Sequence, residues 1–267
     1  MLSGYIRYLK VRNYQKSSIK HYSGQAKAFE KYKAGTSGNI NDYCNYLQSK
    51  RDNKELKDSS LNSHLQSLQM YSAYLKSVQQ ATFSIPLLRQ RITRDKIDYL
   101  SLEEIRRLFD STQCRPEFMY RDQAVLGCLY HLGLRASEAA NLLLEDIDMG
   151  NNLVFVRHSK TGYQRQVPIC ATLKIIFTHY LEIRFFFLIK PNQYFLLGLK
   201  GKLTSEGGIP QIIKRLKKTA EINKKLHPHL LRHTIATHLY QNGMPLEKVS
   251  QFLGHKNIGS TECYTHL

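Results

Sequence analysis

Apolar side chains recur every three or four residues through the first eighty positions, the spacing that places them on one face of a helix. This pattern predicts a short N-terminal helix followed by three longer helices. Serine pairs at 17–18 and 59–60 suit the N-termini of the first and third, and Gly35 stands where the first would end. Ile40 opens the apolar stripe of the second. The pattern therefore predicts a small helical bundle.

The periodicity disappears between 83 and 97, a stretch that contains a proline and predicts an extended connector. Ser101 and Glu104 then have the spacing of a capping box, which marks a helix start and a domain start. Helical spacing dominates the remainder. It predicts helices at 121–132, 137–145, 171–184, 206–219, 228–242 and 245–253.

One segment departs from the helical pattern. Two short β-branched runs in 152–169 flank Lys160, Thr161 and Gly162, which predicts a hairpin with a lysine at its tip. The expected fold is mainly α with a small antiparallel β-sheet. The expected domains are a helical N-terminal domain at 1–85, a linker at 86–97 and an α+β domain at 98–267.

The net charge of the chain indicates which class of partner it binds. The chain has 267 residues, with 39 Lys and Arg against 21 Asp and Glu and a net charge of +18. Residues 1–90 hold 14 basic and 5 acidic side chains, a net +9, with tyrosines between the lysines. A solvated helix face is one interpretation, and a surface that neutralises DNA phosphates is the favoured one. The candidate DNA-binding residues are Arg7, Lys10, Arg12, Lys16, Lys20 and Lys27.

The sequence argues against a membrane-spanning, a secreted and a disulfide-stabilised protein. No apolar run is long enough to cross a bilayer, and the N-terminus lacks the apolar block of a secretion signal. The five cysteines are scattered and odd in number, which argues against a disulfide framework and a thiolate zinc site. We expect a cytoplasmic protein that does not bind membranes.

The segment HPHLLRH at 227–233 carries candidate chemistry. Pro228 suits a first helical turn, and His229 and Arg232 would project from the same side near free backbone N–H groups, where an anion could bind. His229 and His233 also have the spacing of zinc ligands on a helix. Leu230 stands where a metalloprotease has its glutamate, so we expect no metal there.

A second candidate lies in GLRASE at 133–138. Gly133 would end one helix and Ser137 would cap the next, leaving Arg135 at an exposed corner. An arginine at a corner is ordinarily only solvated, so this feature is weak by itself.

The order of these features along the chain resembles the tyrosine recombinases, the family of phage integrases and Xer-like proteins. The residues that carry the resemblance are Arg135, Lys160, His229, Arg232, His255 in LGH and Tyr264. It covers essentially the whole chain, because that family also joins a basic helical core-binding domain, SAM-like in fold, through a linker to a catalytic domain. Only three residues follow Tyr264, which puts the family's usual exchange of a C-terminal helix between protomers in doubt.

The resemblance implies a site-specific DNA recombinase or integrase that works without metal, cofactor or ATP. Tyr264 would attack a DNA phosphodiester to form a 3′-phosphotyrosyl link, and Lys160 would protonate the departing 5′-oxygen. The other expected roles are phosphate binding by Arg135 and Arg232, assistance by His229 and His255, and support by Glu138 and His233.

The implied partner is double-stranded DNA with paired inverted-repeat core sites. The implied assembly is a tetramer on synapsed DNA, with a monomer or dimer off DNA. Two alternatives stay open: DNA relaxation of the type IB topoisomerase kind, and a DNA-binding regulator without catalytic activity.

Overall fold

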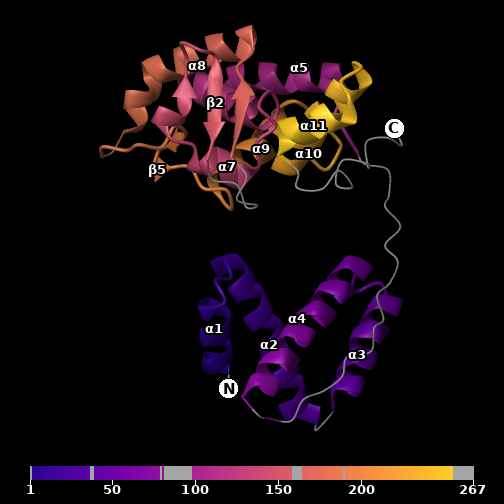
Figure 1. Cartoon of the computed structure of the whole chain (residues 1–267). Coiled ribbons are helices and arrows are strands. Elements are labelled where there is room, and N and C mark those ends of the chain that lie inside the picture. Colours follow the sequence, from indigo (N-terminus) through magenta and orange to yellow (C-terminus); the bar gives the residue numbers. More distant parts are fainter. Residues whose placement is uncertain are drawn as a thin grey trace. The chain divides into compact units, whose positions relative to one another are not determined.

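The chain divides into two compact units, residues 1–94 and 95–267, in a computed structural model (Figure 1). The structure describes residues 2–36, 39–78, 80, 98–157, 164–188 and 190–254. The expected linker at 86–97 lies outside these ranges, so the domain boundaries stay a prediction. Each unit is described by itself below.

The first unit is built from four helices. These are α1 (Leu2–Val11), α2 (Lys16–Thr36), α3 (Ile40–Asp52) and α4 (Asp58–Ser77). Tyrosines form much of its core: Tyr5, Tyr71 and Tyr74 are buried, with the Tyr5 and Tyr71 ring centroids 5.0 Å apart. Gly4 lets α1 approach α4 closely, because a Cβ there would collide with the Tyr74 hydroxyl. The predicted helical bundle is thus present, although its helix starts differ.

Both serine pairs lie inside helices rather than at their caps. Helix α2 begins at Lys16 and includes Gly35, and α4 begins at Asp58. By contrast, Asn39 caps α3 through a capping box with Asp42. The helices begin two or three residues before the predicted starts. Lys57, the N-cap of α4, forms no side-chain cap hydrogen bond, and such a start leaves little trace in sequence.

The second unit is mostly helical. Its α-helices are α5 (Leu102–Asp110), α6 (Met119–Leu129), α7 (Ala136–Asn141), α8 (Ala171–Ile183), α9 (Gly208–Thr219), α10 (Pro228–Gln241) and α11 (Leu246–Leu253). Short 3₁₀ helices are η1 (Ser111–Cys114), η2 (Pro116–Phe118), η3 (Leu144–Asp146) and η4 (Arg184–Phe187). The capping box of Ser101 and Glu104 is present at the start of α5, as predicted.

A three-stranded antiparallel sheet interrupts the helices, in the order β1 (Ile147–Asp148), β2 (Leu153–Val156), β3 (Arg165–Pro168). Val154 faces Val167 across the central pair. The strands of the predicted hairpin are confirmed, and its tip at 158–163 lies outside the described residues. A second pair, β4 (Leu197–Gly198) with β5 (Gly201–Lys202), was not predicted, because two-residue strands show no alternation.

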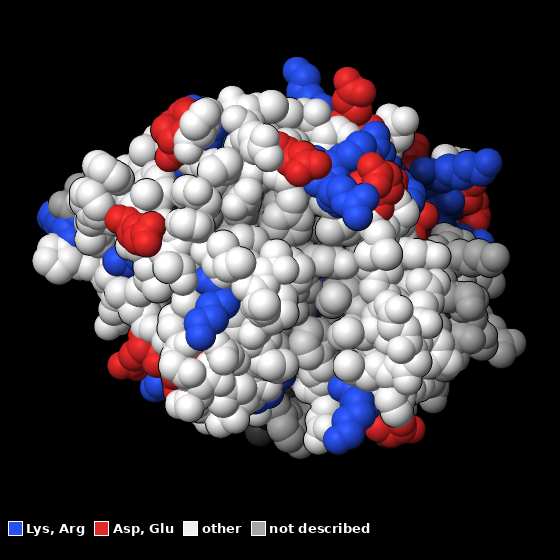
Figure 2. All heavy atoms as spheres, turned by 90° about the horizontal axis from the view of Figure 1, so that it is seen from above, with Lys and Arg blue, Asp and Glu red and all other residues white. Residues whose placement is uncertain are grey.

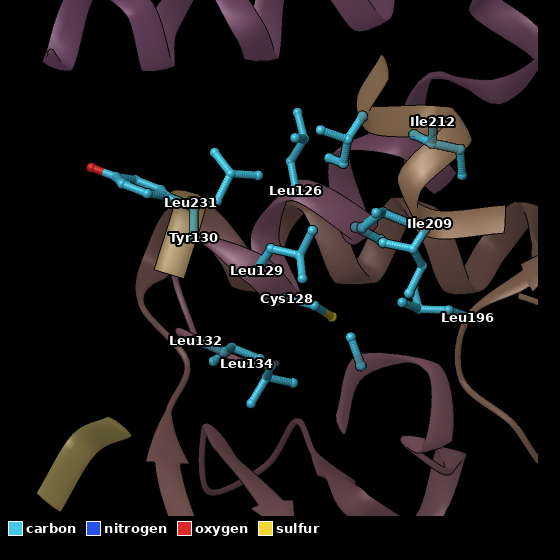
Figure 3. Packing of buried hydrophobic residues seen from close by; sticks show 14 of the residues in the cluster. Leu126, Cys128, Leu129, Tyr130, Leu132, Leu134, Leu196, Ile209, Ile212 and Leu231 are labelled. Carbon is cyan, nitrogen blue, oxygen red and sulfur yellow. The ribbon is translucent and has the colours of Figure 1, made fainter. Parts of the chain in front are cut away.

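Helix α6 is the centre of the core of this unit (Figure 3). All residues from Ala124 to Tyr130 are buried, and α8, α9 and α10 pack around them. Gly127 permits the contact with α8, since a Cβ there would strike Leu173. A helix surrounded on all sides positions the turn that follows it, and that turn leads directly to Arg135.

Within the described residues, no helix is both long and apolar enough to cross a membrane. Cys44, Cys114, Cys128 and Cys170 are free thiols.

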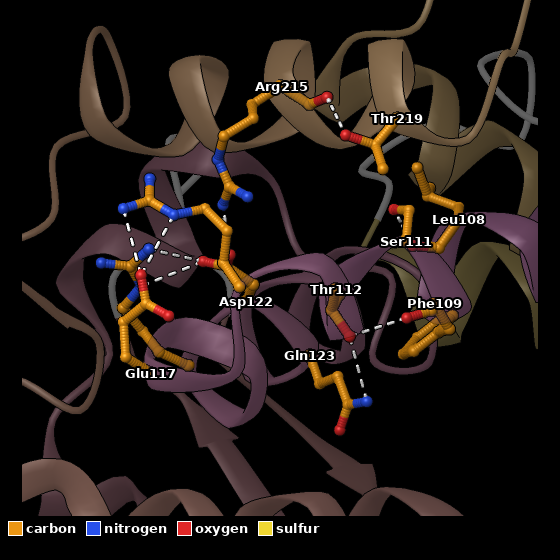
Figure 4. Close-up of polar contacts among 11 residues, drawn as sticks. Leu108, Phe109, Ser111, Thr112, Glu117, Asp122, Gln123, Arg215 and Thr219 are labelled. Carbon is orange, nitrogen blue, oxygen red and sulfur yellow. Dashed lines mark hydrogen bonds and ion pairs between the residues drawn. The ribbon is translucent and has the colours of Figure 1, made fainter.

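A buried carboxylate joins α6 to α9. Asp122 is fully buried, accepts two hydrogen bonds from Arg121 at 2.7 and 3.0 Å, and pairs with Arg215 of α9 (Figure 4). Next to it, Gln123 donates to the Thr112 hydroxyl at 3.2 Å. The buried Asp122 is therefore the shared counter-charge of two arginines.

Replacing this acid should destabilise the second unit. Asp122→Asn is expected to lower the free energy of unfolding by about 3 kcal/mol, because Arg121 would stay buried, and Arg215 partly buried, without a counter-charge. Chemical denaturation checks this. Asp110→Asn, at an exposed position, is the matched control. Equal stability of the two variants would contradict the expectation.

Candidate active site

The turn after α6 positions Arg135. Gly133 has a left-handed backbone, with φ of +58°, and a Cβ there would lie 2.8 Å from the ring of Phe252. Arg135 is itself the N-cap of α7, and its backbone N–H donates to Glu138 Oε2 at 3.0 Å. The expected cap by Ser137 was therefore wrong. The prediction that Arg135 lies at an exposed corner was also wrong, because its side chain is only 18% exposed and donates to Glu138 Oε1 at 2.7 Å.

Arg232 reaches the same place from α10. It is buried, and it donates to the backbone carbonyls of Gly133 and Leu253, both at 2.6 Å. Its Nη1 also lies 3.6 Å from Glu138 Oε2. Arg232 therefore joins the turn before α7 to the end of α11, and it places a second guanidinium beside Glu138.

Glu138 is the common neighbour of three arginines. Besides Arg135 and Arg232, it receives Arg165 of β3, whose Nη2 donates to Oε2 at 2.9 Å and whose Nη1 donates to Oε1 at 3.3 Å. Burial alone would raise the pKa of Glu138. The hydrogen bonds and positive charges, chiefly those of Arg165, outweigh burial and lower that pKa, so the group is a carboxylate at neutral pH.

Three cations around one carboxylate leave an excess of two positive charges. Arginines suit an anion with several oxygens because each planar guanidinium can donate two parallel hydrogen bonds. The arrangement can therefore bind a phosphodiester and stabilise additional negative charge on its oxygens. Within the described ranges, no group of three or more His, Cys, Asp or Glu side chains is arranged to hold a metal ion.

The α10 histidines lie beside this cluster. His229 is exposed at the first turn of α10, where the His227 side chain accepts a hydrogen bond from the Leu230 N–H at 3.2 Å. Desolvation first, and then the charge of Arg232, lower the pKa of His229. Desolvation and the nearby His229 lower the pKa of His233 to about 4. Both rings are therefore neutral at pH 7.

Three of the residues expected in the site, Lys160, His255 and Tyr264, lie outside the described residues. The structure brings together Arg135, Glu138, Arg232, His229 and His233 from α7 and α10. Strand β3, which begins five residues after Lys160, contributes Arg165, and Gly254 immediately precedes His255. The roles of all these side chains stay predictions.

Sequence reasoning missed Arg165. Its signal was a charge in the inward-facing register of a strand: Arg165 alternates with the buried Val167, whereas Gln166 and Pro168 are exposed. A cation on the inner face of a sheet requires a partner. Glu138, 27 residues earlier, could not be identified from local pattern.

The six candidate DNA-binding residues of the first unit all have exposed side chains. They are Arg7 and Lys10 on α1, Arg12 after it, and Lys16, Lys20 and Lys27 on α2. Arg12 lies 4.3 Å from the centroid of the Tyr8 ring. Their exposure suits contact with a polyanion and equally suits solvation, so their role also stays a prediction.

Figure 2 shows the face that is seen from above in Figure 1. Among the described residues on this face, lysines and arginines lie singly or beside acidic side chains, and most of the area is uncharged. On this face, the described residues form no continuous positive surface.

Comparison with known proteins identifies the family of this chain. The model described as "Phage integrase family" matches residues 98–267. The chain is 38% identical over 173 residues to tyrosine recombinase XerC of Oceanobacillus iheyensis, an alignment that covers 63% of this chain and 56% of that protein. It is 30% identical to XerC of Bacillus licheniformis over 100% of this chain and 91% of that one.

Solved structures support the fold. The XerH recombinase bound to a palindromic difH substrate has a TM-score of 0.77 at 19% identity, covering 96% of this chain and 78% of that one. A λ integrase dimer bound to a core site has a TM-score of 0.74 at 17% identity, covering 97% and 95%. The expected fold class, helical with small antiparallel sheets, is confirmed.

The low pKa of His233 predicts a dependence of stability on pH. The unfolded chain binds a proton near the ordinary value of 6.5, whereas the folded chain binds it only near 4. The stabilising contribution of the neutral ring is thus complete above about pH 6.5 and is lost as pH falls toward 4. Denaturation at pH 7 and 4.5 should show a smaller loss for His233→Gln than for the unaltered chain. His179→Gln, on the surface of α8, should keep the full loss, and an equal change in both variants would contradict the assignment.

Proposed function

This chain belongs to the phage integrase family, and on that premise we propose that it is a site-specific DNA recombinase that cleaves and rejoins strands through Tyr264. The observation that carries the proposal is the convergence of Arg135 and Arg232 beside Glu138 from segments almost a hundred residues apart: Arg135 donates to Glu138 at 2.7 Å, and Arg232 lies 3.6 Å from it. An excess of positive charge held in place before substrate arrives is what phosphoryl transfer requires.

In the proposed reaction, the phenol oxygen of Tyr264 forms a bond to phosphorus and the bond from phosphorus to the 5′-oxygen breaks. The tyrosine proton leaves to a neutral acceptor, for which the ring of His229 is available. The 5′-oxygen takes a proton from Lys160 and departs as a hydroxyl. Arg135 and Arg232 donate to the non-bridging oxygens, which carry the extra charge while phosphorus is five-coordinate.

The reverse step rejoins DNA. Because the phosphotyrosyl bond retains the energy of the phosphodiester, a 5′-hydroxyl from either the same or a second strand can displace Tyr264. No ATP is then needed. Exchange between two duplexes requires two sites to be held together, for which we propose paired inverted-repeat sites and a tetramer.

We propose that the exposed cations of α1 and α2 neutralise DNA phosphates. Binding through several such contacts weakens steeply as salt rises, because each neutralised phosphate releases counterions. Solved complexes of similar proteins support DNA as the partner: XerH was solved bound to a palindromic difH substrate, and λ integrase bound to a core site.

Replacing the nucleophile should abolish the covalent intermediate. The substrate is a duplex that the full chain selects from a random-sequence pool, nicked so that the short 5′-hydroxyl fragment diffuses away and cannot rejoin. The unaltered chain should form a protein–DNA adduct stable to denaturant, and Tyr264→Phe should form none while binding the duplex equally. Tyr240→Phe, on α10, is the matched control. Adducts from Tyr264→Phe, loss of adducts in EDTA, or failure to select any duplex would overturn the proposal.

Replacing Lys160 should slow cleavage in a way that a better leaving group corrects. Lys160→Ala is expected to reduce single-turnover cleavage roughly 10²-fold to 10⁴-fold, the usual contribution of a positioned acid. Sulfur in place of the bridging 5′-oxygen leaves without protonation, so this substrate should restore the rate. Lys248→Ala, at an exposed position of α11, should cleave both substrates normally. A defect that persists with the sulfur substrate would exclude Lys160 as the acid.

A further inference from the structure

Arg165 uses all three of its guanidinium nitrogens inside the protein. Nη1 and Nη2 form two nearly parallel hydrogen bonds to the carboxylate of Glu138, at 3.3 and 2.9 Å, and Nε donates to the Phe252 carbonyl at 2.9 Å. The side chain is 8% exposed. Each of its three nitrogens therefore already donates to an acceptor of the protein, either the Glu138 carboxylate or the Phe252 carbonyl.

The pairing determines which charges remain available. Arg135 and Arg232 also lie against Glu138, at 2.7 and 3.6 Å. A carboxylate with only these two partners would draw both of them toward itself. With Arg165 engaged through two bonds, the negative charge of Glu138 already has a counter-charge, and the two remaining positive charges can act on an anion.

Arg165 also joins three segments that surround the site. It extends from β3 to α7 through Glu138 and to the last turn of α11 through Phe252. Gly254 makes the second contact possible, because its backbone is left-handed and a Cβ would lie 3.0 Å from Arg165 Nη1. Arg165 follows Lys160 by five residues, and Phe252 precedes His255 by three. One guanidinium thus joins the strand that follows Lys160 to the helix that precedes His255.

We propose that Arg165 is a positioning residue of the strand-cleavage site, which neutralises Glu138 so that Arg135 and Arg232 stay directed at the scissile phosphate. This inference rests on the proposed function. Arg165 does not itself contact the phosphate in this account. Its effect on cleavage is exerted through Glu138.

The first test separates positioning from general stability. Arg165→Lys keeps the charge but cannot form two parallel bonds and the Phe252 bond together. At saturating nicked duplex, its single-turnover cleavage is expected to fall on the order of tenfold to a hundredfold, with an unchanged dissociation constant for the duplex. Arg184→Lys is the matched control, since Arg184 is equally buried and donates to the carbonyls of Asn192, Tyr194 and Phe195. It should lose stability but cleave normally once folded.

The second test asks whether the effect passes through the charge of Glu138. Arg165→Gln leaves that carboxylate without its two-bond partner, and Arg165→Gln with Glu138→Gln removes both charges together. The double variant should cleave several-fold faster than Arg165→Gln alone, because nothing then competes for Arg135 and Arg232. A merely structural Arg165 would make the two losses add.

The outcomes distinguish the two proposals. If the unaltered chain forms no adduct with its selected duplex, the proposed function fails and the inference falls with it. If the unaltered chain cleaves, and Arg165→Lys cleaves as fast as Arg184→Lys or the double variant is slower than Arg165→Gln, only the inference is overturned.

Discussion

The site depends on the sharing of one buried carboxylate among three guanidinium groups. Glu138 is 1% exposed, and a charge so placed is stable only if it is paired and hydrogen-bonded. Arg135 comes from the same short helix, Arg165 from the sheet and Arg232 from α10, so one acid brings together three separate parts of the unit. Because three cations surround one acid, the cluster carries an excess of positive charge. The proposed phosphate chemistry requires that excess.

Asp122 shows the same chemistry used differently. It too is buried and paired with arginines, Arg121 and Arg215. Here the partners join α6 to α9, and Arg215 is 28% exposed. A cluster of buried arginines and one acid is therefore not by itself evidence of a site. The difference lies in the surroundings: Glu138 lies beside the N-terminal turn of α10 with its neutral histidines, where an anion can be held and a proton accepted.

Much of the fold could be predicted from sequence because it follows local rules. The Ser101–Glu104 capping box, the strands of the 152–169 hairpin and the helices of the second unit are set by residues a few positions apart. Only part of the candidate site could be predicted from the sequence. Arg135 was expected at an exposed corner, and Arg165 was missed, because their environments depend on partners across the fold: Phe252 lies 87 residues after Arg165, and Arg232 lies 99 residues after Gly133. Serine pairs at 17–18 and 59–60 resembled caps, yet the helices begin before them.

The two carbonyl bonds of Arg232 have a consequence for the timing of activity in the cell. Its guanidinium is held by Gly133 on one side and Leu253 on the other, so the arginine cluster is complete only when α11, which follows α10 in the chain, has been synthesised and has packed. A nascent polypeptide on the ribosome, or one damaged by proteolysis near α11, would lack the complete arginine cluster. The proposed strand cleavage would in this way be withheld until translation has passed α11.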